Sequence, residues 1–225
     1  MTWVKICGTT NLEDALTAVD AGADAVGFVF YRQSPRNIDV EAAREIIEHL
    51  PESVEKVGVF VDLDSDAVRE IVLKAGLTAA QLHGKKSMDS VWNDQRPVID
   101  CIGVSKVIPM IHGDALKNEG FFMSERVHEK TFALLLDSRS NRAAGGTGVT
   151  FDWEATRPMV QAISLKVPVI VAGGLTPKNV SQAMSLFQPF GVDVVSGVEA
   201  SPGKKDPEKV RTFVKAVRDT DRKTS

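Results

Sequence analysis

The sequence is short of the features that define several large protein classes. Its 225 residues include only two cysteines, Cys7 and Cys101, too few for a disulfide framework and typical of a reducing compartment. No apolar run approaches the roughly 20 residues that a membrane span needs, and no basic-then-apolar leader precedes Trp3. A net charge of −3 argues against a general nucleic-acid binder. We therefore expect a cytoplasmic protein that binds neither membranes nor nucleic acid.

What is present is an alternation of short apolar runs and amphipathic segments. Hydrophobic residues make up 43% of the chain and charged residues 25%, which is ordinary for a globular protein. Runs typical of buried strands cover residues 3–6, 25–30, 57–61, 79–82, 98–104, 131–136, 167–172 and 192–195. Helical patterns follow them, opened by residues such as Asn11, Asp64 or Ser65, Asp152 and Thr176-Pro177. The last helix is predicted over 208–217.

Eight strand-then-helix units predict a parallel sheet with helical crossovers. In this length they favour a closed (β/α)8 TIM barrel over an open doubly wound sheet, although periodicity alone leaves the open sheet possible. We expect a single domain over residues 1–225, with a polar C-terminal tail that frays from about residue 219. The stretch 108–130 contains Pro109 and two glycines, and it predicts only a short irregular helix near 114–117.

Several chemically capable side chains stand where the predicted strands end, and in a parallel barrel these ends form the active face. Cys7 closes the first run beside Lys5, and its thiol could accept or donate a proton or simply be a buried core thiol. Asp137 closes the sixth run, where a carboxylate is costly unless it is hydrogen-bonded or at a wet mouth. It is a candidate acid or base, or a loop cap. His83 is either a rim group or an ordinary strand-end histidine.

The loops after the strands suggest ligand contacts. Arg36 could offer a bidentate fork to a carboxylate, although most loop arginines are merely solvated. Gly173-Gly174 and Ser196-Gly197 follow the seventh and eighth runs, where such barrels often hold phosphate, and together they favour a phosphate site over simple turns. Gly145-Gly146 lies in a loop suited either to closing over a ligand or to passive connection.

Short motifs recur at the ends of the predicted strands and in the loops after them. They read KICG from Lys5, SPR from Ser34, QLHG from Gln81, LLD from Leu135, GGTG from Gly145, FDW from Phe151, AGGL from Ala172, SGVE from Ser196 and SPG from Ser201. Together these motifs resemble the phosphoribosylanthranilate isomerase family of tryptophan biosynthesis, occur in the family's order and span residues 3–206.

The resemblance implies an eight-stranded barrel, a phosphoribosyl substrate, no cofactor and no metal. It implies an Amadori rearrangement of N-(5-phosphoribosyl)anthranilate to its ribulose form. Cys7 would be the general base, Asp137 the general acid, and Arg36 the contact of the anthranilate carboxylate. The glycine pairs would hold the phosphate, and the chain would be a monomer or a homodimer.

Two alternatives remain open on the sequence. An isomerase of the histidine-pathway type runs a similar rearrangement, but it would be expected to carry Asp in place of Cys7 and to show similarity between its halves. A non-catalytic barrel could bind a phosphosugar without turnover, but a pure binder needs neither Cys7 nor Asp137.

Overall fold

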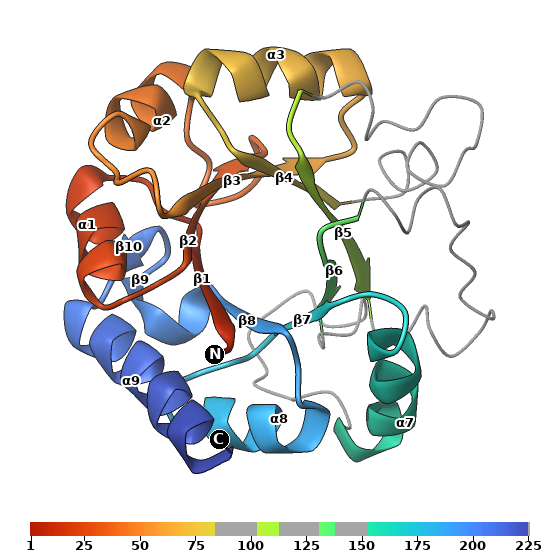
Figure 1. Ribbon diagram of the computed structural model, residues 1–225. Coiled ribbons are helices and arrows are strands. Elements are labelled where there is room, and N and C mark those ends of the chain that lie inside the picture. Colours follow the sequence, from red (N-terminus) through yellow and green to blue (C-terminus); the bar gives the residue numbers. More distant parts are fainter. Residues whose placement is uncertain (84–102, 113–130, 138–152, 225) are drawn as a thin grey trace.

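The computed structural model describes residues 1–83, 103–112, 131–137 and 153–224. Eight parallel strands close into a barrel in chain order, each paired with the next and the last with the first (Figure 1). The strands are β1 (Trp3–Cys7), β2 (Ala25–Phe30), β3 (Glu55–Val61), β4 (Ala79–His83), β5 (Lys106–His112), β6 (Leu134–Asp137), β7 (Val169–Ala172) and β8 (Gly191–Val194). The predicted barrel is confirmed, and the open sheet is excluded.

Helices surround the barrel on its outside (Figure 1). Those described are α1 (Leu12–Asp20), α2 (Val40–Ile47), α3 (Ser65–Ala75), α7 (Trp153–Ser164), α8 (Val180–Phe187) and α9 (Pro207–Thr224). The predicted caps Asn11 and Asp64 accept hydrogen bonds from backbone N–H groups in the first turns of α1 and α3. Between β8 and α9 lie the short helix η2 (Ser196–Val198) and a hairpin of β9 (Glu199–Ser201) and β10 (Lys204–Lys205).

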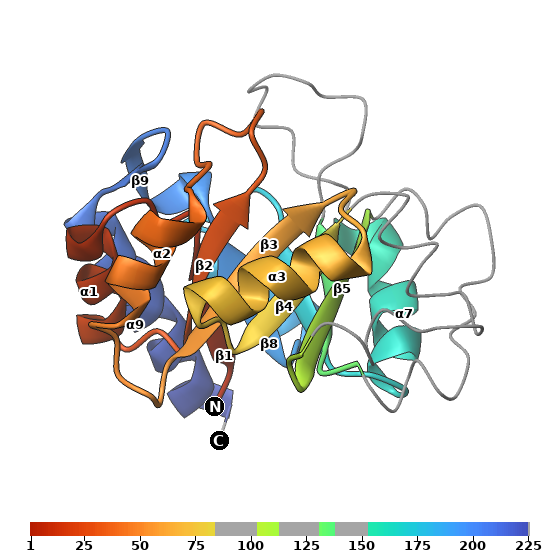
Figure 2. The same cartoon turned by 90° about the horizontal axis from the view of Figure 1, so that it is seen from above.

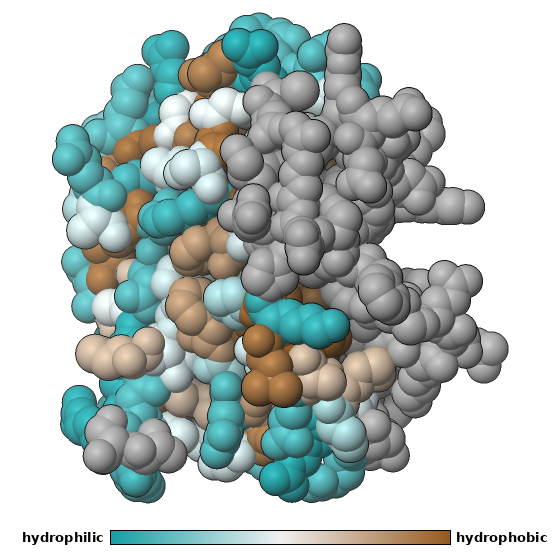
Figure 3. Space-filling model, turned by 45° about the vertical axis from the view of Figure 1, so that its right-hand side comes forward, coloured by the Kyte–Doolittle hydropathy of each residue, from teal (hydrophilic) through white to brown (hydrophobic). Residues whose placement is uncertain are grey.

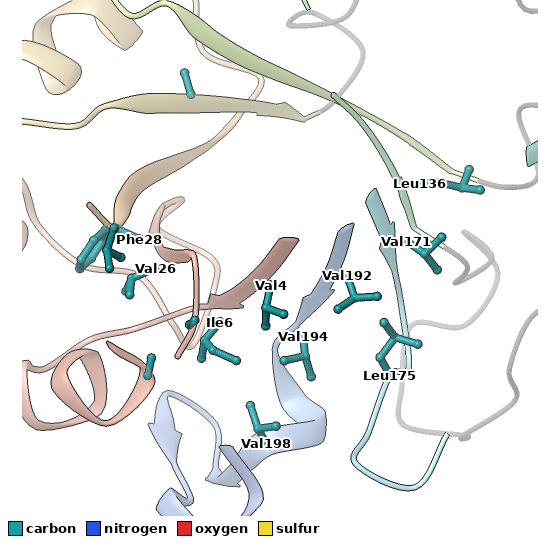
Figure 4. Packing of buried hydrophobic residues seen from close by; sticks show 14 of the residues in the cluster. Val4, Ile6, Val26, Phe28, Leu136, Val171, Leu175, Val192, Val194 and Val198 are labelled. Carbon is teal, nitrogen blue, oxygen red and sulfur yellow. The ribbon is translucent and has the colours of Figure 1, made fainter. Parts of the chain in front are cut away.

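The strands are buried on both faces, which explains their nearly continuous apolar sequences. One cluster fills the barrel interior with side chains such as Ala25, Ile108 and Leu135. A larger cluster packs the strands against the helices, and Figure 4 shows Val4 of β1 close to Val192 of β8 within it. This packing fixes where each strand ends, and therefore where the rim side chains stand.

The fifth strand is not where the sequence placed it. The apolar run 98–104 was the predicted strand, but β5 covers Lys106–His112 and pairs with β4 and β6, while Gly103 and Val104 lie outside any strand. Pro109 lies within β5, and a proline lowers the strand signal of a run because it cannot donate to the ladder. The helix predicted near 114–117 lies outside the described residues.

The last helix is longer than predicted, because α9 continues to Thr224 and does not end at residue 217, while the fraying from residue 219 stays a prediction. Asp221 accepts hydrogen bonds from the backbone N–H of Thr2 at 3.0 Å and from its hydroxyl at 2.6 Å. Arg218 donates to the Thr2 carbonyl at 2.5 Å. These contacts hold the last turns of α9 against the start of β1, and polarity alone did not reveal them.

On the face drawn in Figure 3, hydrophilic residues alternate with scattered apolar ones. Among the residues that the structure describes, no helix combines the length and the apolar character that crossing a bilayer requires.

Candidate active site

A pocket of about 410 Å³ opens among the carboxyl ends of the strands, the ends that point upward in Figure 2. Val29, Val59, Met110 and Leu135 give it apolar walls. Its lining also includes every predicted site residue that the structure describes, namely Cys7, Arg36, His83, Asp137, Gly173, Gly174, Ser196 and Gly197. Gly145 and Gly146 lie outside the described residues. Side chains from distant parts of the chain therefore share one cavity.

Cys7 is the last residue of β1, and its side chain reaches the pocket while the residue is only 4% exposed. Burial raises the pKa of the thiol above its ordinary value, the nearby Lys5 ammonium opposes that rise, and the Asp193 carboxylate adds to it. The thiol is thus protonated at neutral pH. The Lys5 ammonium stabilises the Cys7 thiolate once the thiol has lost its proton.

Lys5 itself is fully buried inside the barrel. Its Nζ donates to Oδ1 of Asp193 at 2.8 Å and to Oε1 of Gln81 at 2.9 Å. Burial alone would lower the pKa of Lys5, but the Asp193 carboxylate, joined by Cys7 once that thiol is deprotonated, outweighs it, so the pKa is raised and Lys5 stays an ammonium. A fixed positive charge therefore stands beneath the Cys7 thiol.

Asp137 ends β6 and His83 ends β4, and both are partly exposed in the pocket. Around the barrel, β6 is three strands from β1 by way of β7 and β8. Asp137 and Cys7 thus approach a bound molecule from different parts of the rim. Such an arrangement suits an acid and a base that act on opposite sides of one substrate.

Arg36 stands in the loop after β2, where its guanidinium makes a bidentate ion pair with Glu199 at the start of β9. Its Nε donates to Oε1 at 2.9 Å and its Nη2 to Oε2 at 2.7 Å. The hydrogen bonds to Glu199 raise the pKa of Arg36, so the guanidinium is charged. The sequence did not predict this ion pair. Glu199 occupies one edge of the Arg36 guanidinium, the group that the sequence analysis expects to bind the substrate carboxylate.

The glycine pairs lie together at the rim, as the phosphate hypothesis requires. Gly173 and Gly174 follow β7 with positive φ angles of 90° and 68°, a backbone conformation that favours glycine. A Cβ on Gly197 would lie 1.8 Å from the carbonyl oxygen of Leu175, so only glycine allows the loops after β7 and β8 to approach this closely. Backbone groups here can come near an anion.

Sequence reasoning missed several polar residues of the site. The sequence indicates Lys5 only as a neighbour of Cys7, and it does not predict Gln81 and Asp193 as site residues. A signal was available, because each is a polar residue in the middle of an otherwise apolar strand and must find a buried partner. Glu199 and Lys205 follow β8 in a loop, and their partners become apparent only in the fold. Among the described residues, no cluster of three or more His, Cys, Asp or Glu is placed to hold a metal ion.

A closed (β/α)8 barrel with a thiol and a carboxylate in a pocket at the carboxyl ends of its strands is typical of enzymes of the TIM-barrel class. The model of the N-(5'-phosphoribosyl)anthranilate isomerase family matches residues 4–216. A relative with that name from Geotalea uraniireducens is 44% identical over 216 residues, covering 96% of this chain and 98% of its own. The chain therefore belongs to the N-(5'-phosphoribosyl)anthranilate isomerase family, whose Amadori isomerisation is a step of tryptophan biosynthesis.

Solved structures of the same family are similar to this chain over nearly its whole length. A phosphoribosylanthranilate isomerase in complex with reduced 1-(o-carboxyphenylamino)-1-deoxyribulose 5-phosphate is 37% identical, with a TM-score of 0.74 and coverage of 97% of this chain and 100% of the other. Monomers generated from the dimeric isomerase of Thermotoga maritima are 36% identical, with a TM-score of 0.72 and the same coverage. One of these neighbours thus holds a small-molecule phosphoribosyl ligand, and the other derives from a dimer.

Proposed function

We propose that Cys7 and Asp137 carry out the Amadori rearrangement of N-(5'-phosphoribosyl)anthranilate in this pocket. Their placement supports this, because the two residues end β1 and β6 and line one cavity from different sides. This is the observation on which the assignment of roles rests.

The proposed reaction begins with ring opening. Asp137 donates its proton to the furanose ring oxygen, the bond from that oxygen to C1' breaks, and the lone pair of the anilino nitrogen forms a C1'–N double bond. Cys7 acts in its thiolate form, which exists once the thiol has lost its proton to solvent and which the Lys5 ammonium stabilises, and it removes the proton from C2'. The electron pair of the broken C2'–H bond forms a C1'–C2' double bond and neutralises the iminium nitrogen. The resulting enolamine takes a proton at C1' and loses that of the 2'-hydroxyl, giving the ketone, an isomer of the substrate.

Binding is divided among other residues in this proposal. Arg36 meets the carboxylate of the aromatic ring with N–H groups that Glu199 does not use. Gly173-Gly174 and Ser196-Gly197 hold the phosphate at the rim between the loops after β7 and β8. His83 completes the rim, while Gly145-Gly146 belongs to the same proposal only as a loop over the ligand.

The test is turnover by the purified full chain. Addition of N-(5'-phosphoribosyl)anthranilate should give loss of its anthranilate-type fluorescence without any added metal or cofactor. An isomerase of the histidine-pathway type would instead turn over its own phosphoribosyl substrate, and a non-catalytic barrel would bind without turnover. Light scattering decides between the predicted monomer and homodimer. One domain over residues 1–225 and a cytoplasmic location stay predictions.

A further inference from the structure

Glu199 occupies one defined edge of the Arg36 guanidinium. A guanidinium has five N–H groups and two edges that can grip a carboxylate, Nε with Nη2 and Nη1 with Nη2. Glu199 takes the Nε–Nη2 edge, at 2.9 and 2.7 Å. Among the described residues it is the only hydrogen-bond partner of the Arg36 side chain, and Arg36 lines the pocket. The Nη1–Nη2 edge can therefore serve a second carboxylate while Glu199 keeps the first.

The charges around Glu199 favour that second carboxylate. Glu199, with a side chain only 5% exposed, also accepts from the fully buried Nζ of Lys205 at 3.2 Å and from the Gly203 N–H at 3.3 Å. Burial raises the pKa of Glu199, but the hydrogen bonds from Arg36 and the charge of Lys205 outweigh it and hold the pKa below its usual value. One carboxylate thus bridges Arg36 and Lys205, and it leaves the Nη1–Nη2 edge of Arg36 available for a second carboxylate.

The same hairpin also contacts the end of β1. Lys205 donates from Nζ to the Cys7 carbonyl at 2.6 Å and from its backbone N–H to Asp14 at 2.8 Å. The hydroxyl of Thr10 donates to the carbonyl of Gly203 at 2.6 Å. Figure 2 shows β9 on the side toward which the β2 arrow points, the side of the pocket. Through Lys205, Glu199 therefore links Arg36 to the residue that carries the thiol.

We propose that Glu199 is a positioning residue for recognition of the substrate carboxylate. It holds the Nε–Nη2 edge of Arg36 and thereby presents the Nη1–Nη2 edge to the carboxylate of the aromatic ring. This inference rests on the proposed function, in which Arg36 binds that group. The opposite behaviour, in which Glu199 competes with the substrate for Arg36, predicts tighter binding when Glu199 is neutralised.

The test measures binding and turnover in Glu199→Gln, with Glu208→Gln as a matched control on the exposed face of α9. The probes are reduced 1-(o-carboxyphenylamino)-1-deoxyribulose 5-phosphate and the same compound without its ring carboxylate. Glu199→Gln should bind the carboxylated probe about 10-fold more weakly and change affinity for the other less than about twofold. KM should rise by a similar factor with a smaller change in kcat, and Glu208→Gln should match wild type.

A double-mutant cycle with Arg36→Met separates positioning from general damage. If Glu199 acts through Arg36, Glu199→Gln should cause no further carboxylate-specific loss in the Arg36→Met background. Equal loss for both probes, unchanged affinity, or tighter binding of the carboxylated probe would overturn the proposal. Should Glu199→Gln not fold, Glu199→Asp, which keeps the charge but is one methylene shorter, is measured with the same expectation.

The failure of this inference can be told from that of the proposed function. A wild-type chain that binds both probes equally, or does not turn over the substrate, contradicts the role given to Arg36 and the site. The other outcome is that the wild-type chain turns over the substrate and prefers the carboxylated probe, and that Glu199→Gln prefers it to the same degree. This result contradicts only the role of Glu199.

Discussion

Lys5 and Asp193 are register partners on β1 and β8, and their side chains form an ion pair of 2.8 Å inside the barrel. The Lys5 side chain is fully buried and that of Asp193 is 6% exposed. A buried pair of this kind offers little net stability over apolar packing, whereas removing one partner leaves an uncompensated charge. The pair therefore makes the barrel interior sensitive to single substitutions while it keeps a positive charge next to Cys7.

Lys5→Met should lower the free energy of unfolding by about 3–5 kcal/mol, because Asp193 is then buried without its partner. The double variant Lys5→Met/Asp193→Asn should regain roughly half of that loss or more, since no unpaired charge remains. Denaturant titration of wild type, Lys5→Met, Asp193→Asn and the double variant measures both effects. Additive losses in the double variant would contradict a mutual pairing.

The pH dependence of the reaction should report the surroundings of Cys7. Because burial raises the pKa of this thiol, activity should rise with pH and kcat/KM should level off above the ordinary thiol range. The Lys5 ammonium stabilises the thiolate, so Lys5→Met should move the rising limb to still higher pH. A pH–rate profile for both proteins checks this, with folding verified at each pH. If the rising part of the pH–rate profile lies at the same pH in Lys5→Met as in wild type, Lys5 does not act on the thiol.

The sequence predicted the barrel and much of the rim for a simple geometric reason. Cys7, His83 and Asp137 each end an apolar run, and parallel closure brings such ends to one face. Local pattern was less informative where a strand carries an atypical residue. Pro109 weakens the strand pattern of residues 106–112, which form β5, so the sequence predicts the strand in the neighbouring run 98–104.

The partners of the site residues could not be predicted in the same way. Arg36 and Glu199 are 163 positions apart, and no local pattern indicates that a loop after β2 meets a hairpin after β8. The contact depends on barrel closure, which makes β1 the neighbour of both β2 and β8. Partners of this kind are properties of the closed fold rather than of any segment.

Removal of either proton-transfer group should lower kcat by roughly 10²- to 10⁴-fold with little effect on binding. Cys7→Ser keeps the shape of the side chain but is a much poorer base, and Asp137→Asn cannot donate an acidic proton. Steady-state kinetics and binding of the reduced product analogue distinguish chemistry from affinity. A Cys7→Ser chain with near wild-type kcat would return Cys7 to a packing role and leave the proposed mechanism without its base.

Gly197→Ala should damage phosphate binding more than chemistry. The added Cβ would lie 1.8 Å from the carbonyl oxygen of Leu175 and 3.1 Å from the Cα of Thr176, both backbone atoms of the loop after β7. The loops after β7 and β8 would have to separate, and the groups around Gly173-Gly174 and Ser196-Gly197 would no longer face one anion. KM for the phosphorylated substrate should therefore rise by about 10-fold or more, while kcat changes less.

Calorimetric titration of the reduced product analogue, with and without its phosphate, checks the origin of this effect. The affinity advantage that the phosphate gives wild type should shrink in Gly197→Ala, while the affinity for the dephosphorylated compound stays within about twofold, because Arg36 and its ion pair with Glu199 lie on the loop after β2 and on β9. Circular dichroism at the assay temperature verifies that the barrel is intact. Equal losses for both compounds would mean that the loops serve the whole pocket, and the phosphate would then have to be held elsewhere on the rim.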